Sequence, residues 1–263
     1  MHRYTTIATI LTALWGMALS QPAAAGAAPD GTDDWLLMVK TRNTDPAQQA
    51  AFNRWYDDID IPDVLKVPGF THALRGARLT RLPIPSGDTD VSDGYVALYD
   101  IRSTDLDKTI IDMLMASWRM DQVGRSTPLI KVVERVYYHA LGTTILGRRG
   151  SGERYLLLQR FGGPEEDARN GSIWQAYLQA IRNDQTDSSV EKASRYELYR
   201  VLMHEAHDAP AFLTVLEIDA PSDQRAAALA AGMNAAFTRA AGQSPTVKLR
   251  DSGLYKIIKD VQR

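Results

Sequence analysis

The strongest constraint on the fold is a pattern of apolar strands and amphipathic helices that occurs twice along the 263 residues. Residues 35–39 resemble residues 155–159, and the helix predicted after each run carries a tryptophan, Trp55 or Trp174. Further matches follow in the same order and at a nearly constant offset, which indicates an internal duplication. These matches are 95–101 with 212–218, and Thr127-Pro128 near Lys131 with Ser244-Pro245 near Lys248.

Within the first copy, the spacing of apolar residues predicts the order β-α-β-β-α-β. Strands are expected over 35–41, 70–82, 94–101 and 131–140. The first helix is expected to begin at Asp45-Pro46 and to end before Pro62, which has no amide donor and disfavours helix at the preceding residue. The second is expected from Ser103 to about Met120, with one core-facing stripe made of Leu106, Ile110, Met113, Leu114 and Trp118.

The predicted fold class is α+β. Two tandem ferredoxin-like units, 35–140 and 155–263, are joined by a glycine-rich linker over 141–154. A four-stranded sheet with helices on one face leaves its other face bare. The two sheets can bury those faces against each other, so we expect an intramolecular α/β barrel.

Residues 1–25 have the pattern of an export signal. His2 and Arg3 precede an apolar stretch over 7–19, and residues 23–25 are small, as a cleavage site requires. Residues 26–34 are small and polar, which is typical of a flexible leader. We expect a periplasmic or secreted protein. An uncleaved anchor and a core helix are the alternatives, although the stretch is shorter than the roughly 20 residues of a membrane span.

The composition excludes several functions. The absence of cysteine excludes disulfides, thiolate nucleophiles and cysteine metal sites. A formal net charge of -2 gives no basis for binding nucleic acid. No phosphate loop or Gly-x-Ser-x-Gly motif supports nucleotide use or serine hydrolysis. We expect no metal and no cofactor, because His204 and His207 lack the zinc-protease spacing and no axial haem ligand stands out.

A helix–turn–strand corner in the first copy carries the most specific signal. Aromatic residues at its helical end are followed by four carboxylates, a proline, and a Val-Pro-Gly-Phe turn at 67–70. This corner resembles the dimeric α/β-barrel superfamily, most closely its EthD-like and antibiotic-biosynthesis-monooxygenase-like members. The resemblance is good over 35–140 and degenerate over 155–259. The residues that carry it are Phe52, Trp55, Tyr56, Asp60, 62–65, 67–70 and Arg75.

The resemblance implies a barrel of two ferredoxin-like units, with a ligand between the sheet and the helices of one unit. Several relatives act on small or polycyclic aromatic molecules without a cofactor, and others have no established activity. The family usually has histidine at the position of Asp60. Aspartate is a weaker base unless burial raises its pKa, so Asp60 is either a base in an apolar pocket or a sign of lost activity. Residues 183–189 lack this corner, so a surviving site is expected in the first copy.

Seven residues make up the predicted site. Asp60 is the candidate base and could form an acid–base pair with His72. Tyr56 and His72 would orient the substrate. The candidate ligand contacts are Trp55, Asp63, Phe70 and Arg75.

Each candidate also has a structural interpretation. Trp55 recurs as Trp174, which favours core packing. Asp60 and Asp63 can cap the turn around Pro62. Arg75 can form ion pairs at a sheet edge. His72 and Arg75 have opposite parity on one strand, so only one of them can face the helices.

Three functions are compatible with these features. The first is a cofactor-independent enzyme that performs oxygenation, cyclisation or elimination on a small aromatic or polyketide-like molecule. The second is a binding protein for a small apolar or aromatic molecule, and the third is a structural or partner-binding barrel. We expect a monomer with an internal pseudo-dimer and no membrane contact after signal cleavage. A homodimer paired through a free sheet edge is the alternative.

Overall fold

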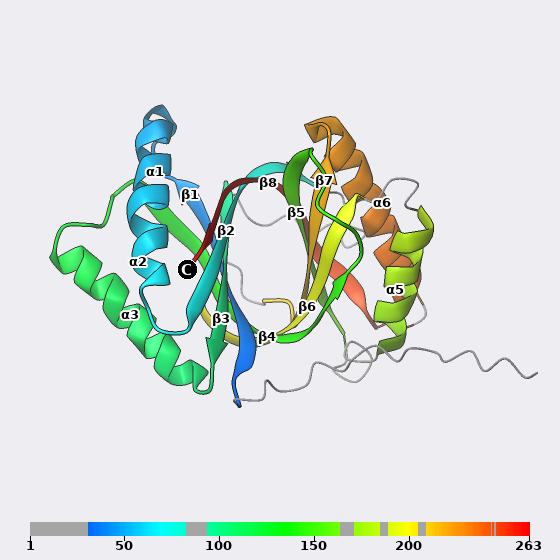
Figure 1. Cartoon of the computed structure of the whole chain (residues 1–263), viewed down its shortest axis with the longest axis horizontal. Helices are drawn as coiled ribbons and strands as arrows, with labels where there is room; N and C mark the ends of the chain where they lie inside the picture. Colours follow the sequence, from blue (N-terminus) through cyan, green and yellow to red (C-terminus); the bar gives the residue numbers. More distant parts are fainter. Residues whose placement is uncertain are drawn as a thin grey trace, which may run out of the picture.

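Eight antiparallel strands close into a barrel in the computed structural model, and helices cover two opposite sides of it (Figure 1). The structure describes residues 31–82, 94–163, 171–184, 189–204, 209–242, 244 and 246–263. The order around the barrel is β1-β3-β2-β8-β5-β7-β6-β4, and β4 pairs with β1 to close it. The strands are β1 (Asp33–Asn43), β2 (Phe70–Arg81), β3 (Tyr95–Ser103), β4 (Ile130–Ile145), β5 (Glu153–Gly162), β6 (Val190–His204), β7 (Phe212–Ala220) and β8 (Lys248–Gln262).

The helices of each half pack on the outer surface of that half's strands. Figure 1 shows α1, α2 and α3 on one side of the barrel, and α5 and α6 on the other. The helical elements are η1 (Pro46–Gln48), α1 (Gln49–Trp55), the π-helical η2 (Tyr56–Asp60), α2 (Ile61–Leu65), α3 (Leu106–Gln122), α5 (Gly171–Asp184) and α6 (Asp223–Ala241).

Two seams join the halves of the chain, because β2 pairs with β8 and β4 pairs with β6. The order β-α-β-β-α-β runs over β1–β4 and again over β5–β8. The predicted α+β class and the barrel closed within one chain are therefore confirmed. Every strand in the described part of the chain has a neighbour on both sides, so none of them offers a free edge for pairing with a second copy.

Alternation along the strands separates three apolar layers. Leu36 and Met38 of β1 point into the barrel with Leu156 and Tyr255 from the second half. Their neighbour Leu37 points outward into the layer beneath α1–α3. A third layer lies between the second half of the sheet and the helices α5 and α6. The middle of the barrel is therefore a packed core rather than an open channel.

Four charged side chains close one end of the barrel interior. Lys40 Nζ lies 2.7 Å from Asp251 Oδ2, and Arg160 Nη2 lies 2.7 Å from Glu134 Oε1. Lys40, Glu134 and Arg160 are almost fully buried. Burial opposes ionisation of Asp251, but the nearby charges of Lys40 and Arg160 outweigh it and lower the pKa of this carboxyl group.

Pro62 lies inside the helical run, which corrects the prediction that the helix ends before it. The Ile61 amide bonds to the Tyr56 carbonyl, five residues back, so the backbone takes a π turn just before the proline. Pro62 then occupies the first turn of α2, where a missing amide donor costs least. The run continues to Leu65 and gives way to β2 through Gly69, whose φ of 94° suits glycine.

Helix α3 presents two apolar faces, not the single one expected. Its N-cap is Asp105, whose carboxylate accepts a hydrogen bond from the Lys108 amide, so the helix begins later than Ser103. Leu114 and Trp118 are exposed, which corrects their assignment to the core-facing stripe. The buried side chains of that stripe are Leu106, Ile110 and Met113.

The strands next to the predicted linker are longer than expected. β4 continues to Ile145 because residues 142–145 pair with β6, and β5 begins at Glu153. Part of the linker assigned to 141–154 is therefore strand.

Residues 1–30 lie outside the described residues, and the predicted signal peptide and most of the leader lie there. Asp33 and Asp34, assigned to the leader, belong to β1. No helix in the described part of the chain is long and apolar enough to cross a membrane.

The seam between β2 and β8 gives a test of the packing. A Cβ added at Gly76 would lie 2.8 Å from Tyr255 Cβ, so we expect Gly76→Ala to lower the free energy of unfolding by about 1–3 kcal/mol in urea denaturation. Gly94→Ala is the control, because a Cβ there meets nothing within 4 Å. Equal losses in the two variants would contradict the close approach at the seam.

Candidate functional site

The predicted corner forms a buried polar cluster between η2 and the sheet. Tyr56 and Asp60 lie one helical turn apart and face β3, where the Tyr99 hydroxyl donates a hydrogen bond to Asp60 Oδ2 at 3.2 Å. Tyr56 and Tyr99 are buried. Asp60 is half-buried as a residue, but its carboxyl group turns inward to meet Tyr99.

Burial controls the acidity of this cluster. It raises the pKa of Asp60 to about 6, and the hydrogen bond from Tyr99 and the charges of Arg135 and Arg75 offset the effect only in part. Burial, followed by the charge of Asp60, also raises the pKa of Tyr56. A carboxyl group with a pKa near 6 is mostly ionised at neutral pH and still accepts a proton readily, which is what a general base requires.

A third tyrosine shares this face of the sheet. Tyr99 and Tyr137 are both register partners of Leu37, on the two strands that flank β1. The Tyr137 hydroxyl is buried and has no hydrogen-bond partner among the described residues. Leaving a buried hydroxyl unpaired is costly. Burial also raises the pKa of Tyr137 to about 12, so this hydroxyl keeps its proton at neutral pH.

Arg75 is fully buried beneath α1 and η2. Its guanidinium donates to Asp57 Oδ1 at 2.9 Å and to Asn53 Oδ1 at 2.8 Å. Its centre lies 4.3 Å from the centroid of the Tyr56 ring, and the rings of Phe52 and Tyr95 are also close. Arg75 joins α1 and η2 to β2 in this position, and it does not form the exposed ion pair at a sheet edge suggested by the sequence.

The remaining corner residues hold neighbouring parts of the chain together. Trp55 Nε1 donates to the Arg125 carbonyl at 2.6 Å. Asp63 pairs with Lys66 and Arg125, both at 2.7 Å. Burial opposes ionisation of Asp63, but the hydrogen bonds from Lys66 and Arg125 outweigh it and lower its pKa. Phe70 is buried with its ring edge-on to Tyr99.

An open cleft of about 530 Å³ lies between the end of α2 and α3. This volume is within the range of small-molecule sites, which begins at roughly 300 Å³. Asp63 lines the cleft, and Asp60 lies one helical turn before Asp63 but does not line it. Apolar side chains form much of the wall, and cations lie at its rim. The lining includes Lys66, Val67, Pro68, Ala116, Arg119, Met120, Val123 and Arg125.

His72 faces the barrel interior, so it does not pair with Asp60. Its Nδ1 lies 2.9 Å from Asp100 Oδ2, and its Nε2 lies 2.8 Å from Asp260 Oδ1. The hydrogen bond to Asp100 is the main cause of a raised His72 pKa; burial opposes it and Asp260 adds to it. Because the pKa is raised, His72 favours the protonated form, in which both ring nitrogens donate.

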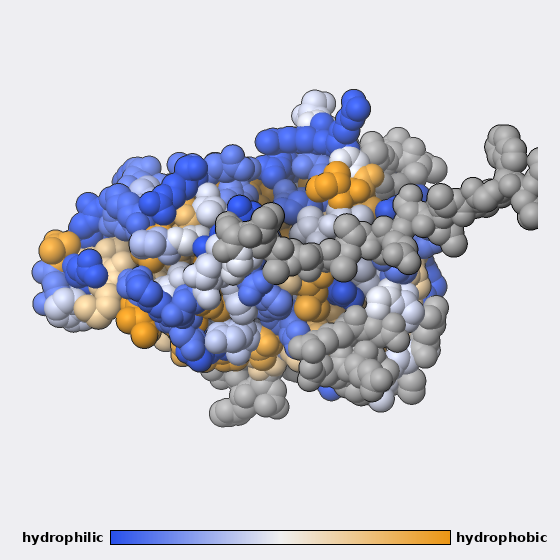
Figure 2. Space-filling model, turned by 60° about the horizontal axis from the view of Figure 1, so that its bottom comes forward, coloured by the Kyte–Doolittle hydropathy of each residue, from blue (hydrophilic) through white to orange (hydrophobic). Residues whose placement is uncertain are grey.

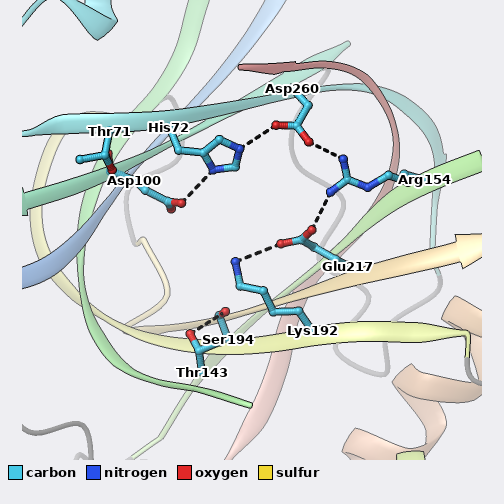
Figure 3. Close-up of polar contacts among 9 residues, drawn as sticks. All are labelled: Thr71, His72, Asp100, Thr143, Arg154, Lys192, Ser194, Glu217 and Asp260. Atoms are coloured by element: carbon cyan, nitrogen blue, oxygen red, sulfur yellow. Dashed lines mark hydrogen bonds and ion pairs between the residues drawn. The ribbon is translucent and has the colours of Figure 1, made fainter. Parts of the chain in front are cut away.

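The ion pairs of His72 continue around the mouth of the barrel (Figure 3). Asp260 also binds Arg154, and Glu217 links Arg154 to Lys192 at 2.8 and 3.1 Å. A pocket of about 420 Å³ opens beside this network. Its lining includes Asp34, Trp35, Asp100, His139, Lys192 and Tyr196.

Sequence reasoning missed Tyr99, Tyr137, Asp100 and Asp260. The two tyrosines left a signal, because each occupies a helix-facing position in a strand assigned from its apolar residues. Asp260 left none, because it reaches His72 only after β8 pairs with β2.

The second half buries neutral polar groups between its sheet and the helices α5 and α6. Tyr177 donates to Gln159, and Gln159 donates to Asn234, both at 2.8 Å. A cavity of about 10 Å³ lies beside Tyr177. In the described residues, no group of three or more histidine and acidic side chains is arranged to hold a metal ion. Residues 205–208 of the histidine-containing loop lie outside the described residues.

Solved structures resemble the whole architecture. An anthrone oxidase-like protein aligns with a TM-score of 0.54 at 14% identity, over 88% of this chain and 93% of that chain. A candidate chlorite dismutase aligns at 0.51 and 13%, over 86% and 95%. A candidate monooxygenase from Lactobacillus acidophilus NCFM aligns at 0.50 and 10%, over 88% and 96%.

This chain has the dimeric α/β-barrel fold. The resemblance seen at the helix–turn–strand corner is thereby confirmed at the level of the fold. No protein-family model matches the sequence, and no curated protein matches it. At these identities the dimeric α/β-barrel fold is shared, and each neighbour's activity remains a statement about that neighbour.

The raised pKa of Asp60 predicts a stability change. The folded state binds the Asp60 proton more tightly than the unfolded state does, so this residue lowers stability as pH rises from about 4 through about 6. We expect Asp60→Asn to raise the free energy of unfolding at pH 8 by about 1–3 kcal/mol, and to change it little at pH 4. Exposed Asp58→Asn is the control in urea denaturation. A pH-independent effect of Asp60→Asn would refute the buried carboxylate.

His72 predicts a pH dependence of the same sign at higher pH, because its pKa is also raised on folding. Its pKa is raised on folding, so its stabilisation is complete below the unfolded pKa of about 6.5 and is lost as pH rises through the folded pKa. His72→Gln should therefore cost on the order of 1 kcal/mol at pH 6 and less at pH 9. His139→Gln, which removes a ring packed on Trp35, is the control for the loss of a histidine side chain. A constant cost of His72→Gln across this range would argue against the two-carboxylate pairing.

Proposed function

We propose that this protein is a cofactor-independent enzyme in which Asp60 removes a proton from a small aromatic or polyketide-like substrate. The observation that carries the proposal is the buried Asp60 carboxyl group, whose pKa is raised to about 6 beside Tyr99. A general base contributes most when its pKa lies near the working pH. The second half lacks the helix–turn–strand corner that carries Asp60, so we expect one such site in each barrel.

The side chains around Asp60 supply the remaining roles. Tyr99 donates a hydrogen bond to Asp60 Oδ2 and would hold the carboxylate in position. Arg135 lies close enough to lower the pKa of Asp60, so it also favours negative charge there. The cleft between α2 and α3 is large enough to hold the substrate next to this corner.

Anthrone is a suitable probe, because one of the similar structures is an anthrone oxidase-like protein. Asp60 would take the C10 proton, and the resulting enolate would react with O2 at C10. Loss of water then gives anthraquinone. One O2 is consumed for each quinone and each water formed, so the carbon is oxidised and oxygen is reduced without a further reductant.

The same proposal includes the tandem duplication of the chain and its export. The second half is a degenerate copy that arose by tandem duplication, supported by the repeated element order and by the matched sequence segments. The protein is an exported, EthD-like member of its superfamily. The N-terminal sequence pattern supports export, and the corner residues support the EthD-like assignment.

Binding without chemistry is a second candidate function. The cleft between α2 and α3 has apolar walls, and Asp60 does not line it. The Asp60 carboxylate is also already bonded to Tyr99. A ligand could therefore be held in this cleft without meeting a base.

Kinetics on anthrone test the enzyme proposal. The wild-type kcat/KM should rise with pH through about 6 and then level off, as Asp60 ionises. Asp60→Asn should lower kcat by about 10²–10⁴-fold, because the base is lost. Asp58→Asn is the matched control and should retain wild-type kcat. Oxygen uptake and anthraquinone absorbance measure the reaction, with the uncatalysed rate subtracted.

Two results would count against Asp60 as the base. Turnover of Asp60→Asn at the wild-type rate would remove this residue from the mechanism. Retention of anthrone by the wild-type protein without quinone formation would favour the binding function.

A further inference from the structure

Exposed apolar side chains are concentrated on α3 of the first half and on the strand β6 of the second half. Nine of the eleven large apolar side chains that are exposed among the described residues lie on α3, just after it at Val123, or on β6. On α3 they are Ile111, Leu114, Met115 and Trp118, which lie on one helical face at spacings of three and four residues. Ile111 and Trp118 are 59% and 57% exposed. Figure 2 shows apolar surface among polar surface at the left of the molecule, where α3 lies.

The fold does not require this α3 stripe. The N-caps of α3 and α6, Asp105 and Ser222, place the two helices in register. In that register the four stripe positions of α3 correspond to small, exposed residues of α6. These are Ala228, Ala231, Gly232 and Ala235. The matching helix positions thus carry small residues in α6 and large apolar residues in α3. This difference points to a contact that only α3 makes.

The α3 stripe is symmetric about its centre. Ile111 and Trp118 lie equally far from the midpoint between Leu114 and Met115. The charged residues Lys108 and Asp121 are also equally far from it, on the exposed side of the helix. Lys108 pairs with Asp112 of its own helix at 2.6 Å, and a two-fold axis at this midpoint adds the partner's Asp121 on its other side, at both ends of an apolar centre.

We propose that two copies of this chain associate through their α3 helices, packed antiparallel about a two-fold axis near Leu114 and Met115. Ile111 meets the partner's Trp118, and Lys108 faces the partner's Asp121. Such an isologous contact uses the same surface on both copies and stops at a dimer. Pairing through a sheet edge has no strand available in the described part of the barrel, so a helix face is the surface left for it.

The apolar surface of β6 adjoins the stripe and enlarges the contact. The Tyr199 hydroxyl donates to Asp107 Oδ1 at 3.1 Å in the first turn of α3, and Arg200 pairs with the same carboxylate at 2.9 Å. Val201 and Met203 follow on β6 and are 40% and 47% exposed. The two surfaces meet at Asp107, so the dimer can bury more than one helix face, as stable interfaces require.

Sedimentation velocity of the full-length chain over a concentration series tests this proposal. We expect a concentration-dependent dimer for the wild type. Leu114→Ala/Trp118→Ala should raise the dimer Kd at least tenfold, because it removes the apolar centre. Alanine occupies the matching positions of α6, so circular dichroism and thermal unfolding should show a folded protein. Ile145→Ala/Ile258→Ala removes exposed apolar groups elsewhere and should leave the Kd unchanged.

Charge reversal tests the antiparallel geometry itself. Lys108→Glu or Asp121→Lys alone should weaken the dimer several-fold, and the two together should restore it, because each swapped charge again meets its opposite on the partner. The proposal fails if the wild type is a monomer up to about 100 μM, if Leu114→Ala/Trp118→Ala leaves the Kd unchanged, or if the paired reversal gives no recovery. Species that grow beyond a dimer would instead indicate a head-to-tail contact and would also overturn it.

Discussion

Backbone pairing across two seams, β2 with β8 and β4 with β6, is the constraint on which the rest of the structure depends. Without it, each half would expose the apolar inner face of a four-stranded sheet. Closure brings together groups that are far apart in the chain. Lys40 meets Asp251 at one end of the barrel, and His72 meets Asp260 at the other. Both polar ends of the interior are products of these seams.

The strand order could be predicted because the alternation of apolar and polar residues can be read within each short segment of the sequence. The features that were not predicted depend on the three-dimensional structure. Pro62 was read as a helix end, but a π turn places it where its missing donor is tolerated. Leu114 and Trp118 were assigned to the core because a helix with two apolar faces has no single stripe. The parity argument for His72 and Arg75 correctly separated them, but only closure shows that His72 meets two carboxylates.

The corner around Asp60 combines features that seldom serve stability alone. A π-helical segment, an ionisable carboxyl group in an apolar layer and an unpaired tyrosine hydroxyl lie on one face of the sheet. Each costs free energy that a neutral, well-packed residue would not. In the second half, the buried polar side chains are neutral: Gln159 accepts a hydrogen bond from Tyr177 and donates one to Asn234. This difference supports the proposal that the functional site lies in the first half.

Joining both halves in one polypeptide has a consequence for how such barrels can multiply. In a barrel built from two identical chains, every surface feature occurs twice, on opposite sides. A self-associating helix face would then be present on both sides of each barrel. Contacts through it would link one barrel to the next without limit and form a filament. Here α3 carries the apolar stripe and α6 carries alanine and glycine in its place. Because both halves belong to one chain, one side of the barrel can carry a self-associating helix face and the other side can lack it. Assembly through α3 therefore stops at two chains.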